Sequence, residues 1–185
     1  LTLNGNVTNK LGVGNDAGSI SGILSLGSST RGFVVDANTE LVVRAKITAV
    51  TAGLTKSGAG QLTLTSSFND YPGFTTVQAG TLMLSGGAKA GSTANGTVIG
   101  QGAQLLLWSA TVGDEPLSLN GTTNRAALAF AGTNSWAGAV SLAGDCAVDV
   151  FPTNYSDNHL TFSGVISGTG AMRLVSWGHL HFTGL

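Results

Sequence analysis

Two histidines near the end of the sequence have a spacing that could support shared chemistry. His179 and His181 are one residue apart, so an extended backbone places both imidazoles on one strand face, about 7 Å apart, with Leu180 opposite. Two imidazoles could begin a metal site, but zinc needs further ligands and His159 is remote in the sequence. We therefore expect no metal and no cofactor. The pair is interpreted as exposed polar residues, with a glycan- or surface-contacting patch that includes Trp177 as the alternative.

Carboxylate pairs would indicate a polysaccharide hydrolase, since glycosidases use two carboxyl groups about 5 to 9.5 Å apart. Asp145 and Asp149 share a predicted strand face, but four residues of strand separate them by about 13 Å. Asp114 and Glu115 are adjacent, so an extended strand points them to opposite sides, and the following Pro116 favours a turn. The sequence therefore predicts no catalytic residue. A carbohydrate-active enzyme remains the alternative, because residues distant in the sequence could still meet.

The remaining reactive or charged side chains have simpler interpretations. Cys146 is the only cysteine, which excludes an intrachain disulfide, and its alternation with Val148 predicts a buried small residue. Lys56, Arg44 and Lys46 are expected as solvated charges that discourage unwanted strand pairing. The tryptophans are predicted to cover turns or coil edges, with a sugar-stacking surface as the alternative: Trp108, Trp136 and Trp177.

The composition excludes several classes of protein. Charged residues make up 9% of the 185 residues, against roughly 25% in an ordinary globular protein, and the formal net charge is −1. The eight Lys and Arg residues are scattered, so no basic patch would attract nucleic acid. No apolar run approaches the ~20 residues that cross a bilayer, so we expect no membrane insertion by this segment. Apolar residues, at 42%, are still enough to build a core.

The elements that must position these residues are short β-strands. Leu41, Val43, Ala45 and Ile47 alternate with more polar neighbours, which is the period of two of a strand. Similar runs recur in groups about twenty residues apart, as successive coils of a solenoid would. They are found at 62–64, 82–84, 104–107, 128–130, 146–150, 160–162 and 179–182. Glycine-containing turns such as 58–60 separate them, and 88–94 is expected to be a loop because its glycine, serine and threonine disfavour a helix.

The chain also repeats itself over a long distance. Leu-Thr-Leu-Asn-Gly at 1–5 returns as Leu-Ser-Leu-Asn-Gly at 117–121, and 19–26 returns at 135–142 with the same offset. Repetition on this scale is typical of solenoids, whose coils bury apolar faces only by stacking on neighbours. We predict one β-solenoid segment over 1–185, with a superrepeat at 1–116 and a partial second copy at 117–185. The expected partners are further repeats of the same chain or identical chains stacked end to end.

One stretch carries a family resemblance. Residues 54–64 read LTKSGAGQLTL and 71–82 read YPGFTTVQAGTL, with Asn69 between them. This pattern resembles the passenger-associated β-strand repeat of bacterial autotransporters. The resemblance implies a right-handed parallel β-helix that is secreted to the cell surface or beyond. It assigns a structural role to the motif residues Lys56, Gly58, Gly60, Leu62, Leu64, Asn69, Tyr71, Gly73, Val77, Gly80 and Leu82.

These observations together predict an all-β protein with a mechanical role. The leading hypothesis is a non-catalytic structural shaft of an extracellular bacterial surface protein or fibre, similar to an autotransporter or adhesin stalk. An adhesive variant would contact glycans or cell surfaces. Two alternatives stay open, namely a self-assembling subunit of a homopolymeric β-solenoid filament and a carbohydrate-active β-helix enzyme.

Overall fold

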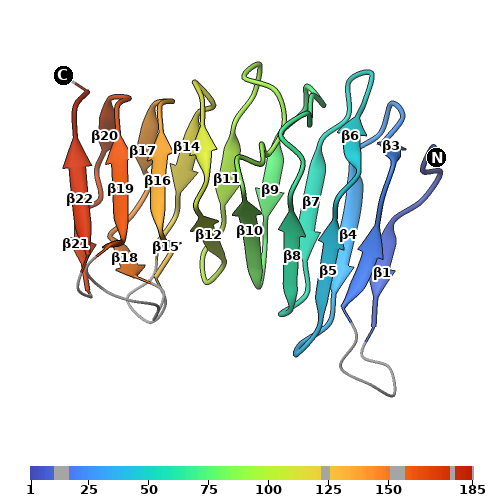
Figure 1. Cartoon of the computed structure of the whole chain (residues 1–185), viewed down its shortest axis with the longest axis horizontal. Helices are drawn as coiled ribbons and strands as arrows, with labels where there is room; N and C mark the ends of the chain where they lie inside the picture. Colours follow the sequence, from blue (N-terminus) through green and yellow to red (C-terminus); the bar gives the residue numbers. More distant parts are fainter. Residues whose placement is uncertain (11–16, 122–125, 151–156, 176–177, 185) are drawn as a thin grey trace.

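Two long parallel sheets lie side by side along the molecule in the computed structural model (Figure 1), which describes residues 1–10, 17–121, 126–150, 157–175 and 178–184. The first sheet has the spatial order β1 (Val7–Asn9), β4 (Arg31–Val35), β7 (Leu54–Ser57), β9 (Thr75–Val77), β11 (Thr97–Ile99), β14 (Leu117–Leu119), β17 (Val140–Leu142) and β20 (Ile166–Gly168). The second sheet has the order β2 (Gly18–Ile20), β5 (Glu40–Val43), β8 (Gln61–Leu64), β10 (Thr81–Ser85), β12 (Gln104–Trp108), β15 (Leu128–Ala131), β18 (Cys146–Val150) and β21 (Met172–Leu174).

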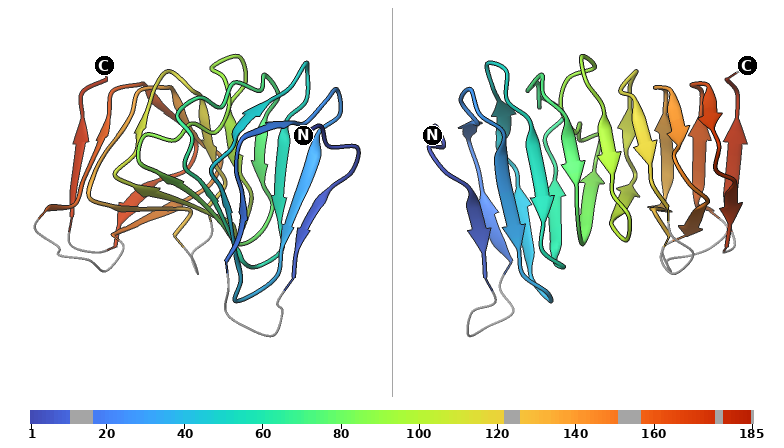
Figure 2. Two further views of the ribbon diagram at one scale, coloured as in Figure 1. Left: turned by 45° about the vertical axis from the view of Figure 1, so that its right-hand side comes forward. Right: turned by 180° about the vertical axis from the view of Figure 1, so that it is seen from behind.

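A third face closes the coils at both ends of the molecule. It consists of β3 (Ile23–Ser25) and β6 (Lys46–Thr48), and then of β13 (Thr111–Val112), β16 (Thr133–Trp136), β19 (His159–Phe162) and β22 (His179–Phe182). The strand pairs of all three faces are parallel, and the chain winds from one face to the next (Figure 2). The described residues contain no α-helix, and no helix among them is long and apolar enough to cross a membrane. The predicted all-β parallel solenoid is confirmed.

The core is a set of apolar ladders, because the inward residues of successive coils stand in register. In the second sheet Leu62 pairs with Leu82, Leu82 with Leu105, and Leu105 with Leu128, and all four side chains are fully buried. Each buried leucine contributes about 1.5 to 3 kcal/mol through the hydrophobic effect. The alternation in the sequence thus fixes which side of each strand faces inward.

The run from Leu41 to Ile47 shows how the period of two extends past one strand. All four alternating residues are buried as predicted, but the chain turns between β5 and β6 at Arg44 and Ala45, with the bend at Ala45. Val43 and Ala45 are both buried on either side of the exposed Arg44, so the alternation continues through this corner.

The third face is interrupted in the middle of the solenoid. Residues 65–74 and 86–96, which follow β8 and β10, carry no strand. The prediction of a loop at 88–94 is confirmed. The division into a 1–116 unit and a partial copy at 117–185 stays a prediction.

Candidate functional site

The most unexpected side chain of the core is Lys56. In the first sheet it pairs with Phe33 on one side and Val77 on the other, within a ladder that is otherwise apolar at these positions. Its exposed fraction is 0%. The prediction that Lys56 is a solvated charge is therefore wrong. The alternation along the strand shows which positions face inward. It does not show the hydrogen-bond partners that allow a lysine to be buried, so a solvated charge was expected.

Backbone carbonyls satisfy the Lys56 ammonium. Its Nζ donates to Ser57 O and Gly58 O, both at 2.7 Å, and to Ala79 O of the next coil at 3.1 Å. Hydrogen bonds from a charged donor contribute about 1.5 to 3 kcal/mol each, whereas a buried charge without partners is costly. Lys56 thus holds the 57–60 turn against the 78–80 turn of the following coil.

The glycines of these turns allow the coils to approach closely. A Cβ on Gly60 would lie 2.1 Å from Asp36 O in the preceding coil, and a Cβ on Gly80 would lie 2.4 Å from Gly58 O. Gly80 also has a φ of 71°, which L-residues with a side chain rarely adopt. The Gly-x-Gly turn of the motif is therefore required by the stacking of corners, and the Lys56 contact to Ala79 depends on the same close approach.

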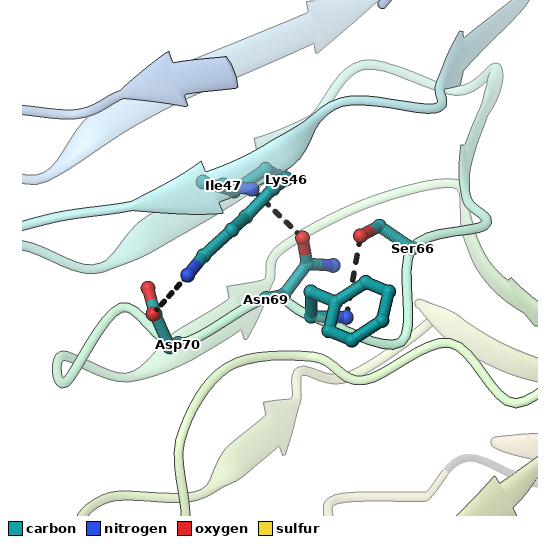
Figure 3. A network of polar contacts seen from close by, with 6 residues as sticks. Lys46, Ile47, Ser66, Asn69 and Asp70 are labelled. Carbon is teal, nitrogen blue, oxygen red and sulfur yellow. Dashed lines mark hydrogen bonds and ion pairs between the residues drawn. The ribbon is translucent and has the colours of Figure 1, made fainter. Parts of the chain in front are cut away.

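Asn69 replaces the hydrogen bonds that the interrupted third face lacks. Its Oδ1 accepts from the Ile47 amide at 2.9 Å (Figure 3), and its Nδ2 donates to Lys89 O at 2.7 Å. Ile47 lies in the coil before and Lys89 in the coil after, so one side chain joins three coils. Asn134 plays a similar part where the face resumes, since its Oδ1 accepts from the Ala110 amide at 2.8 Å.

Tyr71 fills the interior beneath the same loop. It is fully buried, and its hydroxyl shares a hydrogen bond with Thr75 Oγ1, which itself donates to Ala90 O. Burial raises the pKa of the Tyr71 phenol, so the hydroxyl stays neutral. The apolar motif residues are all fully buried in the ladders: Leu62, Leu64, Val77 and Leu82.

The other two cations that were predicted to be solvated are so. Arg44 is exposed. Lys46 forms an ion pair with Asp70 at 2.7 Å (Figure 3), and the two side chains are 40% and 52% exposed. Exposed pairs of this kind contribute about 0 to 1 kcal/mol.

Glu115 is a buried carboxyl group that the sequence did not reveal. Asp114, its neighbour, is exposed at a bend, whereas Glu115 faces inward and its Oε1 accepts from Thr97 Oγ1 at 2.5 Å. Burial raises the pKa of Glu115 to about 7, although the Thr97 hydroxyl, the Ala90 amide and the Lys89 ammonium each lower it in part. Glu115 lines a pocket of ≈ 260 Å³ that also includes Lys89.

The structure brings His159 to the two histidines that the sequence singled out. His159 pairs with His179 in β19 and β22, and the two rings stack with centroids 4.7 Å apart. The His181 ring lies 5.7 Å from His159 and 6.4 Å from His179. Only the stacking of coils could reveal this group. In the described part of the chain, no group of three or more His, Cys, Asp or Glu side chains is arranged to hold a metal ion.

The alternative of a sugar-stacking surface made by all three tryptophans does not hold. Trp136 is fully buried and its Nε1 donates to Glu115 O at 2.7 Å, so it cannot stack on a sugar. Trp108 is partly buried in β12, and Trp177 lies outside the described residues. His179 and His181 are exposed, as predicted.

Asp145, which precedes β18, and Asp149 and Cys146 within it have structural partners. Asp145 Oδ1 accepts from the Ala171 amide at 2.9 Å, and Asp149 Oδ1 accepts from the Val150 amide at 2.8 Å. Cys146 is buried as predicted, and burial raises the pKa of its thiol, so the reactive thiolate is disfavoured.

Comparisons with known proteins agree with this geometry. The model of the passenger-associated-transport-repeat family matches residues 54–84, which run from β7 through the Asn69 loop to β10. The chain is also similar to the adhesin BmaC autotransporter of Brucella suis biovar 1 (strain 1330), with 35% identity over 128 residues. That match covers 64% of this chain but only 4% of the length of the adhesin. No solved structure matches the chain.

The matched segment contains the features that tie neighbouring coils together, namely the Lys56 ammonium, the close-packed glycines and the Asn69 amide. The resemblance to the passenger-associated transport repeat is thus confirmed over residues 54–84, and the chain is similar to an autotransporter adhesin over 128 residues.

Proposed function

We propose that this segment is a non-catalytic shaft of an extracellular, adhesin-like bacterial surface protein, in which it holds other parts of the protein away from the cell. One observation carries the proposal: both long sheets continue through every coil, with an apolar ladder inside and parallel pairing between coils. Bending such a segment would break backbone hydrogen bonds and buried contacts in several coils at once.

Ties between coils support a mechanical role. Lys56 and Asn69 each join successive coils through backbone groups, which resists shear where the third face has no strand. The similarity to a protein named as an adhesin autotransporter supports an extracellular location. A role in presenting an adhesive tip and a location at the cell surface follow as parts of the same proposal.

The proposed partners of the shaft are further coils of the same chain. The first test is the denatured mass of the native protein from its source cells, together with electron microscopy of the undenatured material. A mass several times 18.5 kDa and slender rods are expected. A mass near 18.5 kDa together with long fibres would refute the covalent shaft and favour a self-assembling filament.

The absence of catalysis needs a separate test. The native protein is incubated with a panel of neutral and acidic polysaccharides, and substrate depletion and new reducing ends are measured. No turnover is expected, because the carboxylates of Asp145 and Asp149 accept hydrogen bonds from backbone amides and Glu115 is largely buried. Clear turnover of one polysaccharide would overturn the non-catalytic role.

A further inference from the structure

Two rows of outward residues cross the first sheet along the solenoid axis. The residues that precede the paired positions Thr75, Thr97, Leu117, Val140 and Ile166 share one register, as the strand pairing shows. This row, the apolar row, consists of Phe74, Gly96, Pro116, Ala139 and Val165. Two positions further along each strand lies the second row, the hydroxyl-rich row, which consists of Thr76, Val98, Ser118, Ser141 and Ser167.

The apolar row carries exposed apolar side chains at both ends and an exposed proline, Pro116, at its centre. Phe74 and Val165 are 54% and 53% exposed, whereas Gly96 and Ala139 between them have little or no side chain. Since neighbouring strands lie about 4.8 Å apart, the four coil steps from Phe74 to Val165 span about 19 Å. The strands concerned, β9 to β20 of the first sheet, lie side by side along the molecule (Figure 1).

A groove of ≈ 330 Å³ lies over these rows. Its wall includes Phe74 and Pro116 on the apolar side and Ser118, Ser141 and Ser167 on the hydroxyl side. None of the described residues that line it is charged. A ligand that carried charges would lose its hydration there without gaining a counterion, so the groove favours a neutral ligand.

We propose that this groove binds a neutral, extended polysaccharide whose chain runs parallel to the solenoid axis. The C–H faces of the sugar rings pack on Phe74 and Pro116, as sugar rings do on apolar and aromatic surfaces. The sugar hydroxyls exchange hydrogen bonds with Ser118, Ser141 and Ser167, since each serine hydroxyl can both donate and accept. The serines recur once a coil, so an elongated chain of similar sugar units meets the same partners repeatedly.

The groove goes beyond the shaft role and does not depend on it. A shaft whose outer face binds no glycan would show the large mass and slender rods expected above, but no binding in the titration below. A glycan-binding domain that is not a shaft would bind in the titration but would not show the large mass and slender rods. The two proposals can therefore fail separately.

Binding is measured by titrating the native protein with the extended oligosaccharides cellohexaose, xylohexaose and mannohexaose at millimolar concentration, with hexagalacturonate as the charged counterpart. At least one neutral hexasaccharide is expected to bind and hexagalacturonate is not. Phe74→Ala should weaken that binding at least tenfold, and Ser118→Ala combined with Ser141→Ala at least fivefold. The matched control is Phe68→Ala, because Phe68 is 73% exposed and lies outside the groove lining, so its effect should stay within twofold.

Several results would overturn the proposal. These are no binding of any neutral hexasaccharide, equal binding of hexagalacturonate, or an equal loss in Phe74→Ala and Phe68→Ala. Sedimentation analysis tests the rival occupant, a second copy of the chain. Self-association that Phe74→Ala abolishes would assign the groove to that copy and would also overturn glycan binding. Far-UV circular dichroism of each variant shows that the sheets are retained, which is expected because the substituted side chains face outward.

Discussion

Replacing the Lys56 ammonium tests whether a buried cation holds the repeat together. Lys56→Met keeps a side chain of similar length inside the ladder but removes the donor for Ser57 O, Gly58 O and Ala79 O. Each charge-assisted bond has a net contribution of about 1.5 to 3 kcal/mol, so three of them set the upper limit of the loss. The actual loss is smaller than their sum, because one ammonium makes all three bonds and their contributions are not additive. The expected net destabilisation is about 2 to 5 kcal/mol.

The assay must report locally, because a solenoid does not necessarily unfold in one step. Native-state hydrogen exchange reads the amides that bridge the two turns, such as Gln78, which donates to Lys56 O, and Thr81, which donates to Gly60 O. If these amides exchange by opening of the turns, a loss of 2 to 5 kcal/mol accelerates exchange by about thirtyfold to several thousandfold, since about 1.4 kcal/mol corresponds to a factor of ten.

Lys46→Met is the matched control. Lys46 is also a lysine of a β-strand, but its ammonium is solvated and pairs with an exposed carboxylate. Its loss should cost less than about 1 kcal/mol and leave the exchange of the Gln78 amide nearly unchanged. If Lys56→Met costs no more than Lys46→Met, the buried ammonium does not clamp the two turns and the reasoning is refuted.

Three further predictions concern other ties in the same coils. The pKa of Glu115 is raised to about 7, so the folded state holds its proton more tightly than the unfolded chain; this stabilisation is complete below about pH 4.5 and disappears as the pH rises through 7. In urea unfolding, the free energy of unfolding of Glu115→Gln should therefore rise relative to that of the wild type by up to about 3 kcal/mol between pH 5 and pH 8. A difference between the two proteins that stays constant across this range would contradict the raised pKa of Glu115. Gly60→Ala forces a Cβ against Asp36 O and should lower the midpoint of thermal unfolding by several degrees. The control is Gly5→Ala, where a Cβ meets nothing within 4 Å and the midpoint should stay unchanged. Equal midpoints for the two variants would refute the close approach of the coils at Gly60. Asn69→Ala leaves the Ile47 amide without its acceptor and should lower the free energy of unfolding by about 1 to 3 kcal/mol, which is measured as faster hydrogen exchange of that amide. Unchanged exchange would show that water replaces the side chain.

The sequence by itself determined the class of fold. Apolar residues at every second position, as at Leu62 and Leu64, specify strands with one buried face whatever their partners are. Regular spacing of such runs between glycine turns favours successive coils, because each coil must stack to bury that face. The motif from 54 to 82 then identified the type of coil. These signals are local, so they can be recognised in the sequence without knowledge of the tertiary structure.

Only the tertiary structure decided which side chains meet. Paired residues are 20 positions apart for Gln61 and Thr81 and 26 apart for Val7 and Phe33, so the register changes with the length of each turn. The sequence could not show that Lys56 reaches Ala79, that His159 stacks on His179, or that outward residues of five coils form a groove. Each of these depends on the coil-to-coil register, which the packing of the corners sets and no local pattern contains.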